Sequence, residues 1–126
     1  MTDLPPFELA HPRTELRRQL VDAVLRGEKI ATAGLLEEYE AEGEQPEPAG
    51  SRCALLGYDD ELVAVVEVTE SRVLPAAEID EQFAHDEGEG FETVDEWREA
   101  HESFFGRPIE PETQIVAVRF RVVEQL

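Results

Sequence analysis

The segment Gly27-Glu28-Lys29-Ile30-Ala31-Thr32 stands where a helical pattern ends and a more extended pattern begins. Lys29 is the only lysine of the chain, since all the other strongly basic residues are arginines. A lysine changes its pKa readily on burial, so it can serve as a base or as a polarising cation. Two interpretations are open. Either Lys29 and Thr32 belong to a functional site, or Gly27 ends a helix, Lys29 is a solvated loop residue and Thr32 begins a strand.

The residues before this segment predict an amphipathic helix over residues 12–26. Leu16, Leu20 and Val24 recur at the i, i+4, i+8 spacing that is typical of a buried helical stripe. Gly27 suits the position just past the helix end, where the backbone often turns left-handed. The other faces of this helix carry the polar residues Arg13, Arg17, Arg18, Asp22 and Arg26.

The rest of the chain predicts, in order, an extended segment, a short helix, two strands, two helices and a last strand, at residues 29–34, 35–41, 52–58, 62–74, 75–87, 93–105 and 114–124. Asp59-Asp60 between the two adjacent strands indicates an antiparallel hairpin. The second of these strands is apolar on both faces at its start, which suits a barrel or a helix-covered sheet. This order is not the regular alternation of a doubly wound sheet. It predicts an α+β fold, a small mixed or closed sheet flanked by helices.

Length and composition predict one domain over residues 1–126, with residues 1–11 an irregular lead-in. The start of the chain lacks the basic and apolar regions of a signal peptide, and no apolar run has the roughly 18 residues of a membrane span. Cys53 is the only cysteine, so no internal disulfide forms and a reducing, cytoplasmic location is expected. With three scattered histidines and no cysteine cluster, no metal site is expected.

The formal net charge of −19 restricts the kinds of ligand. Proteins that hold long stretches of nucleic acid gain affinity by neutralising phosphates with Lys and Arg, and this chain offers a field of the opposite sign. An extended grip on RNA or DNA is therefore disfavoured. A small ligand, one nucleotide or a short RNA contact stays compatible with this charge, while most of the carboxylates serve solubility.

At Gly27-x-Lys29-x-x-Thr32 the chain resembles a known family, because this pattern after an amphipathic helix is similar to the Gly-x-Lys-x-x-Thr signature of ASCH domains in the PUA-like superfamily. The resemblance continues at residues 36–44, 66–69, 83–90 and 97–105 and covers residues 13–124. The lysine–threonine signature alone is weakly specific. Five matching segments in the same order are strong evidence of membership.

The resemblance implies a small PUA-like β-barrel with helices around it and a cleft into which the lysine loop points. PUA-like domains often bind RNA or modified nucleobases, and other ASCH members are proposed to bind or cleave RNA. One bacterial ASCH branch resembles amidohydrolases that remove the acyl group of N4-acetylcytidine. Its catalytic lysine, threonine and glutamate would fall on Lys29, Thr32 and Glu87.

One departure from the family pattern concerns an arginine that many members carry two residues after the threonine. Gly34 stands at that position here. If that arginine holds a phosphate or a carbonyl group, the chain either lacks this contact or supplies it from elsewhere. Arg52, Arg98 and Arg119 are the candidates for such a replacement.

Glu87 is also singled out by its place in the sequence. It continues the apolar stripe of Ile79 and Phe83, so its carboxylate can be carried towards the core and desolvated. Burial would raise the pKa of Glu87 and suit it to general acid–base work. In the competing interpretation the helix ends at Asp86, and Glu87 is a solvated acid beside glycines.

Lys29 and Thr32 raise a question of geometry. Residues three apart in a regular strand point to opposite faces, so these two converge only if the chain turns between them. In amide hydrolysis, Thr32 would attack the acyl carbon, and Lys29 would take its proton or steady the oxyanion. Glu87 would then donate to the leaving amine, and no metal or organic cofactor is needed. The competing interpretation is that all three only hydrogen-bond a base.

The expected ligand-binding residues are Tyr39, Glu67, Arg98 and His101. Tyr39 lies beside the lysine loop, and Glu67 lies where its strand turns polar. His101 shares a helical stripe with Trp97, so it is either a ligand contact or a packed core residue. The sequence therefore predicts a domain that binds a nucleoside or a short RNA, with amidohydrolase chemistry on an N-acylated nucleoside as the first hypothesis. The alternative is a non-catalytic RNA or modified-nucleotide binding module, and ribonuclease activity is a third hypothesis.

Overall fold

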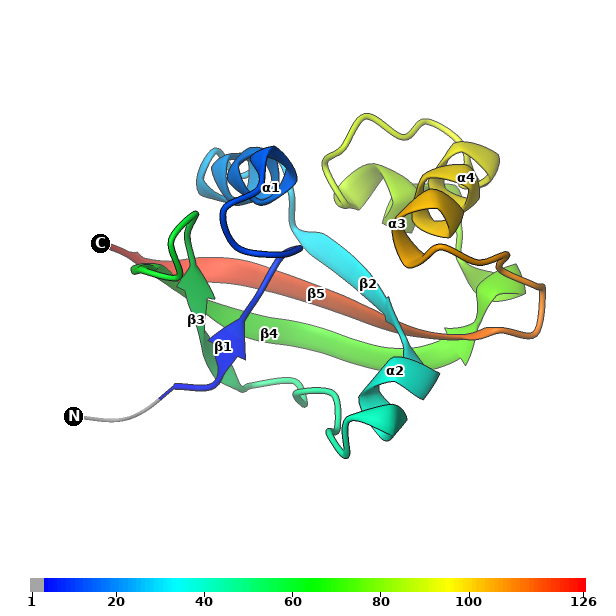
Figure 1. Ribbon diagram of the computed structural model, residues 1–126, viewed down its shortest axis with the longest axis horizontal. Helices are drawn as coiled ribbons and strands as arrows, with labels where there is room; N and C mark the ends of the chain where they lie inside the picture. Colours follow the sequence, from blue (N-terminus) through cyan, green and yellow to red (C-terminus); the bar gives the residue numbers. More distant parts are fainter. Residues whose placement is uncertain (1–3) are drawn as a thin grey trace.

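A computed structural model describes residues 4–126 as one curved sheet with helices packed against it (Figure 1). In chain order the elements are β1 (Pro6–Phe7), α1 (Glu15–Leu25), β2 (Ala31–Leu35), α2 (Leu36–Ala41), β3 (Arg52–Leu56), β4 (Leu62–Pro75), a 3-10 turn (Ala76–Glu78), α3 (Glu81–Asp86), α4 (Val94–Phe105) and β5 (Gln114–Gln125). Over residues 4–126, no helix has the length and apolar character required to cross a membrane.

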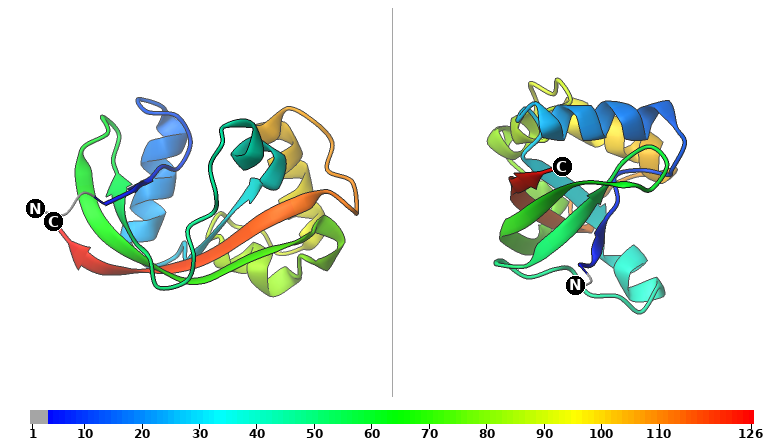
Figure 2. Two further views of the ribbon diagram at one scale, coloured as in Figure 1. Left: turned by 90° about the horizontal axis from the view of Figure 1, so that it is seen from below. Right: turned by 90° about the vertical axis from the view of Figure 1, so that its left-hand side faces the viewer.

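The five strands are ordered β1-β3-β4-β5-β2 in the sheet. β1 runs parallel to β3, and every other neighbouring pair is antiparallel. The register of β4 against β5 shifts twice, between Val65 and Val66 and between Val68 and Glu70. Such bulges bend a sheet, and β4 and β5 are visibly curved (Figure 2). The predicted α+β fold and the β3–β4 hairpin are confirmed, although β1 and β2 remain edges and the barrel-like sheet does not close.

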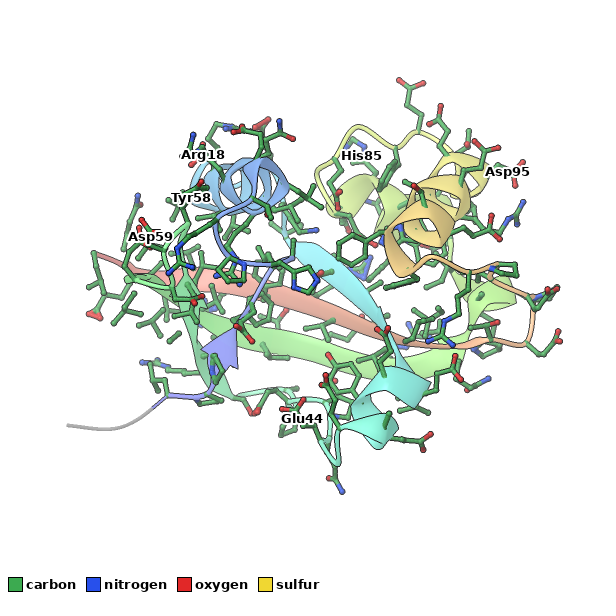
Figure 3. All side chains as sticks on the ribbon, viewed as in Figure 1. Arg18, Glu44, Tyr58, Asp59, His85 and Asp95 are labelled. Carbon is green, nitrogen blue, oxygen red and sulfur yellow. The ribbon has the colours of Figure 1, made fainter. Side chains whose placement is uncertain are left out.

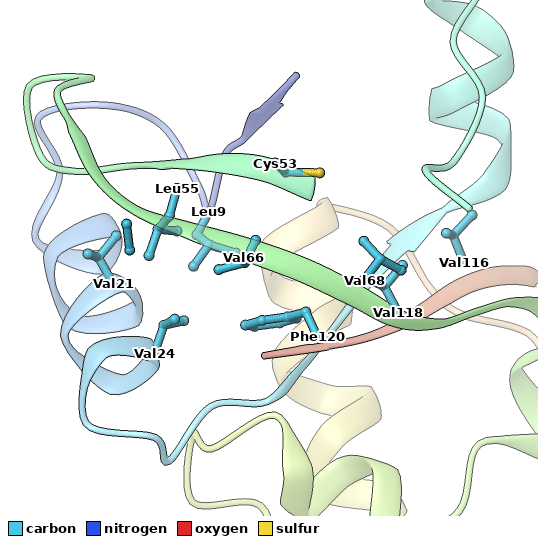
Figure 4. Packing of buried hydrophobic residues seen from close by; sticks show 11 residues of the cluster. Leu9, Val21, Val24, Cys53, Leu55, Val66, Val68, Val116, Val118 and Phe120 are labelled. Carbon is cyan, nitrogen blue, oxygen red and sulfur yellow. The ribbon is translucent and has the colours of Figure 1, made fainter. Parts of the chain in front are cut away.

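Both faces of the sheet are covered, so β5 buries alternate residues in two separate cores. Val116, Val118 and Phe120 pack with Val21 and Val24 of α1 (Figure 4). The residues between them face a second core under α3 and α4, made of Ile115, Ala117, Leu35, Phe83 and Trp97 among others. Alternation with period two places these two sets on opposite faces. α1 therefore packs on one face of β5 and α3 and α4 pack on the other, and residues of α1 and α4 line one pocket beside the edge strand β2.

The first helix begins three residues later than predicted. Thr14 is its N-cap, with an extended backbone and a hydroxyl that accepts a hydrogen bond from the Arg17 N–H. Arg13, just before it, has a φ of 59°, which is incompatible with the regular helix that was expected to begin at residue 12. The predicted end is confirmed, because Gly27 leaves the helix with a φ of 81°.

The buried face of α1 is rotated from the predicted one. Arg17, expected on a polar face, has no exposed surface, whereas Leu16 is 38% exposed. The Arg17 guanidinium donates to the backbone oxygens of Gly57 and Ala10 and to the carboxylate of Asp60. These acceptors come from the β3–β4 turn and the segment after β1, so the neighbours of α1 decide which face is buried.

Two further expectations need correction. The lead-in over residues 1–11 was expected to be irregular, but Pro6–Phe7 forms β1 and pairs with Ala54 and Leu55 of β3. The single helix predicted over residues 75–87 is instead a 3-10 turn followed by α3. The break falls at Ile79, whose ψ of 126° is extended, and Asp80 then caps α3 by accepting from the Phe83 N–H.

Candidate functional site

A pocket of about 340 Å³ is lined by residues of α1, α4, β2 and the loops that carry Lys29 and Glu87. Its lining residues are Glu8, Leu9, Ala10, Leu16, Leu20, Lys29, Thr32, Ala33, Glu87, Glu89, Phe91, Ala100, His101, Ser103 and Phe104. The buried charged members Lys29, Glu87 and His101 form its deep end. Leu16 and Phe104, which are exposed, form its mouth.

Lys29 is buried because the chain turns sharply between α1 and β2. The Lys29 N–H bonds to the Ala23 carbonyl at 3.1 Å, and the Ile30 N–H bonds to the Asp86 carbonyl at 2.8 Å. These two contacts tie the lysine loop to α1 on one side and to α3 on the other. The side chain of Lys29 is 2% exposed, so it is not the solvated loop residue of the competing interpretation. The turn also allows Lys29 and Thr32 to line the same pocket.

Gly88 fits this arrangement because its backbone lies directly against the lysine loop. A β-carbon at Gly88 would lie 2.3 Å from the carbonyl oxygen of Glu28 and 2.6 Å from the Cα of Lys29. Gly88 also has a φ of 68°, which side chains rarely adopt. The close approach of the two backbones places residues 87–89 next to Lys29.

Glu87 is the C-cap of α3, and its carboxylate is 1% exposed. It accepts a hydrogen bond from the indole N–H of Trp97. Its Oε1 lies 3.2 Å from Nε2 of His101 and 3.5 Å from Nζ of Lys29. Lys29 Nζ also donates to the Glu87 carbonyl at 3.2 Å. One carboxylate therefore joins the lysine loop to α4.

The contacts of His101 decide where its protons lie. Nδ1 is 2.8 Å from the carbonyl oxygen of Trp97, which can only accept, so Nδ1 carries a proton. Nε2 then faces the Glu87 carboxyl group, and one further proton must lie between them. Burial alone would lower the pKa of His101, but the hydrogen bond to Glu87 and its charge raise it overall. The contacts and the raised pKa of His101 favour a charged pair, in which Nε2 of His101 donates to the Glu87 carboxylate.

The expectation of a raised pKa for Glu87 is wrong. Burial does raise it, but the hydrogen bond from His101, the charge of Lys29 and the hydrogen bond from Trp97 outweigh this effect and hold the pKa of Glu87 below its ordinary value. A carboxylate with three donors around it is stabilised in its charged form. The lowered pKa favours the carboxylate form of Glu87 and disfavours the predicted role as a proton donor.

Glu89 also lines the pocket, although it was not among the predicted site residues. Its Oε2 lies 3.1 Å from Nζ of Lys29, and its side chain is 26% exposed. Gly88 and Gly90 on either side both have positive φ, so the loop bends Glu89 back over Lys29. The Gly-Glu-Gly sequence could have indicated that Glu89 lies in the site, because two glycines around one charged residue favour such a bend.

Three of the predicted ligand-binding residues lie outside this pocket. Glu67 is held on the sheet by Arg121 at 2.8 Å and Arg52 at 3.7 Å, and the hydrogen bond from Arg121 lowers its pKa. Arg98 pairs with Asp95 at 2.8 Å, and Asp95 lies on the side of α4 away from α1 (Figure 3). The fourth, His101, is in the pocket.

Tyr39 is the remaining one, and it lies beside Gly34 rather than in the pocket. A β-carbon at Gly34 would be 3.2 Å from Cε1 of Tyr39, so the tyrosine ring covers the position of the family arginine. Burial, followed by the charges of nearby glutamates, raises the pKa of Tyr39. Arg119 does not replace the arginine either, since it pairs with Glu70 and Asp86.

A second cavity, of about 380 Å³, lies on the other side of α4 and contains none of these charged pocket residues. It is lined by Ala76, Ala77, Val94, Trp97, Arg98, Ile109, Glu110 and Pro111. Within residues 4–126, no group of three or more His, Cys, Asp or Glu side chains is placed to hold a metal ion. The pocket between α1 and α4 is therefore the candidate functional site.

The ion pair of Glu87 and His101 predicts a pH dependence of stability. The pKa of His101 is raised, so its contribution is complete below the ordinary histidine value of about 6.5 and is lost as the pH rises through the folded-state value. The pKa of Glu87 is lowered, so its contribution is complete above about 4.3 and is lost as the pH falls through the folded-state value. The free energy of unfolding should therefore decline as the pH rises above about 6.5.

Urea unfolding at a series of pH values between 5.5 and 8.5 measures this decline. His101→Gln should remove it, because glutamine does not titrate. His85→Gln is the matched control, since His85 is an exposed histidine on α3 (Figure 3). A decline of the same size in the His101→Gln variant would contradict the assignment to this pair.

Comparison with known proteins links the fold to earlier structures. A family model for the ASCH domain matches residues 9–124. An ASCH domain structure from Lactobacillus crispatus is 26% identical, with a TM-score of 0.82 over 98% of this chain and 82% of that one. Protein EF3133 from Enterococcus faecalis is also 26% identical, with a TM-score of 0.83 over 99% of this chain and 79% of that one. A hypothetical protein, 17% identical with a TM-score of 0.62 over 86% of this chain and 94% of that one, supports the fold alone. No curated protein matches the chain.

Proposed function

Because this chain belongs to the ASCH domain family, whose PUA-like fold is often linked to RNA binding, we propose that its pocket binds one nucleoside-like ligand and hydrolyses the amide of an N-acylated nucleoside such as N4-acetylcytidine. The observation that carries the proposal is the meeting of Lys29, Thr32 and Glu87 in one pocket from distant parts of the chain. Its volume of about 340 Å³ lies in the range of small-ligand sites.

In this proposal Thr32 is the nucleophile and Lys29 stabilises the oxyanion. The hydroxyl oxygen of Thr32 forms a bond to the acyl carbon, the bond from that carbon to the amine nitrogen breaks, and the hydroxyl proton ends on the leaving amine. Water then hydrolyses the threonyl ester to release the acid. The buried ammonium of Lys29 is suited to the developing oxyanion, because a fixed charge acts strongly away from water.

We assign the transfer of the proton to Glu89 rather than Glu87. Glu87 is ionised and held by Lys29, His101 and Trp97, which makes it a poor base and leaves it without a proton to donate. The carboxylate of Glu89 lines the pocket, is partly exposed and is held by Lys29. Glu87 then acts as a positioning residue that orients Lys29 and His101.

The test is release of cytidine from N4-acetylcytidine by the purified protein, followed by liquid chromatography. Lys29→Met should lower kcat/KM by about 100-fold or more, since one oxyanion donor is typically worth that much. Thr32→Val should abolish turnover, because it removes the nucleophile and keeps the shape. Arg98→Ala is the control and should keep turnover, since Arg98 lies outside the pocket. Turnover that survives Thr32→Val would contradict the role of Thr32.

The second candidate is a non-catalytic module for a modified nucleotide or a short RNA. The ion pairs of Lys29 favour this candidate. Its Nζ is paired with the carboxylates of both Glu87 and Glu89, which neutralise its positive charge and leave less of that charge for an oxyanion. A folded wild-type protein without turnover would favour this module. Its affinity for a short RNA should then fall steeply with salt, whereas hydrolysis of a neutral nucleoside should hardly respond.

A further inference from the structure

The mouth of the pocket is formed by apolar side chains that the helical patterns predict to be buried. Leu16 of α1 is 38% exposed and Phe104 of α4 is 52% exposed, and both line the pocket. Leu20, one turn after Leu16, and Phe91 are half-buried and line the same pocket. The two helices therefore present apolar side chains from both sides of one opening.

Leu16 and Phe104 are exposed although the helical pattern of apolar residues predicts that both are buried. A stripe at i, i+4 spacing normally faces the core, yet Arg17 takes the buried position on α1 and Leu16 faces the pocket. Phe104 follows the buried Trp97 and His101 on α4, and it also faces the pocket. Disagreements of this kind are expected at functional sites, and exposed large apolar groups that gather in one place mark binding surfaces.

The charges around the pocket indicate what these side chains contact. The strongly basic group among the lining residues is Lys29, which is already paired with two carboxylates. The partly exposed acids Glu8 and Glu89 also line the pocket. A phosphate at the mouth would meet these acids, whereas an uncharged apolar group would cover the leucine and phenylalanine side chains.

We propose that the ligand carries an uncharged apolar group larger than acetyl, which packs between Leu16 and Phe104 while the amide end lies at Lys29. The placement of the amide rests on the proposed function. The acetyl group offers one methyl, which covers less of the exposed apolar surface of Leu16 and Phe104 than a larger acyl group would. An N-acyl group with a longer chain or an aromatic ring would be the preferred substrate class.

The test uses N4-methylcytidine, N4-butylcytidine and N4-benzylcytidine, which contain no amide and so cannot be hydrolysed. Their dissociation constants for the wild-type protein are measured by isothermal titration calorimetry. Affinity should rise by about tenfold or more from the methyl to the larger groups, because added apolar atoms are removed from water. Equal affinities for the three probes, or no binding of any, would overturn the proposal.

Two variants test the contact residues. Leu16→Gln and Phe104→Gln should each remove most of the gain in affinity from N4-methylcytidine to the larger probes, because a polar amide replaces the apolar contact surface. Leu62→Gln is the matched control, because Leu62 is 48% exposed on β4 and lies outside the pocket. If both pocket variants kept the full gain in affinity for the larger probes, Leu16 and Phe104 would be rejected as the contact residues.

The probes also separate this inference from the proposed chemistry. If the protein prefers the larger probes but does not deacylate N4-acetylcytidine, the apolar binding site is supported and the amidohydrolase function is rejected. If the protein deacylates N4-acetylcytidine but binds the three probes equally, the amidohydrolase function is supported and the preference for a larger apolar group is rejected.

Discussion

Replacement of Glu87 by glutamine is expected to lower the free energy of unfolding by about 3 to 5 kcal/mol, the usual effect of removing one partner of a buried ion pair. Glutamine has the same shape but no charge. It would leave Lys29 and His101 buried beside a neutral group, where each lies within 3.5 Å of the carboxylate in the native protein. Urea unfolding at pH 6, followed by circular dichroism, measures the change.

Glu89→Gln is the matched control for this variant, because Glu89 contacts the same lysine but is 26% exposed. Partial solvation weakens such a pair, so the loss should stay below about 1 kcal/mol. If the two variants lost the same stability, the carboxyl group of Glu87 would have to be neutral in the folded protein. The Glu87→Gln variant should also lose most of the decline in stability above about pH 6.5, because His101 no longer has its carboxylate partner.

Gly88→Ala is expected to lower the free energy of unfolding by about 3 kcal/mol, the sum of backbone strain and overpacking. The added β-carbon would lie 2.3 Å from the carbonyl oxygen of Glu28, and a backbone atom cannot rotate away as a flexible side chain can. The lysine loop or the segment after α3 must therefore move. Thermal or urea unfolding gives the loss of stability.

Gly90→Ala separates the two causes of this loss. Gly90 also has a positive φ, of 89°, but a β-carbon there would meet no atom within 4 Å. Gly90→Ala should therefore lower the free energy of unfolding by about 1 kcal/mol, which is the cost of the backbone strain alone. Equal losses for the two alanine variants would contradict the close contact between Gly88 and the lysine loop.

Much of the fold was predictable because the signals are local. The Asp59-Asp60 turn lies between strands that pair as a hairpin, and the cap at Thr93 starts α4 as expected. β1 was missed because two residues carry no pattern of their own, and Pro6–Phe7 is a strand only through its pairing with β3. The buried face of α1 was misjudged for a similar reason. The acceptors that hold Arg17 lie about 40 residues further along the chain and at the N-terminal side of the helix.

The residues that line the pocket were predictable only in part, and the charge of Glu87 was not predictable from its own helix. Lys29, Thr32 and Glu87 were named from the family resemblance, and they do line one pocket. The charge of Glu87 depends on His101 and Trp97, which reach it from another helix, so the stripe on its own helix could not reveal its lowered pKa. Tyr39 was chosen because it is near the lysine loop in sequence, but it packs over Gly34, outside the pocket.

Trp97 is the only tryptophan of the chain, so all of the indole fluorescence of the protein originates beside the charged end of the pocket. Its ring stacks on His101 with centroids 4.5 Å apart, and its N–H bonds to Glu87. A protonated imidazole quenches an excited indole more strongly than a neutral one. The intensity of the emitted light is therefore expected to report the protonation of His101 without any added label.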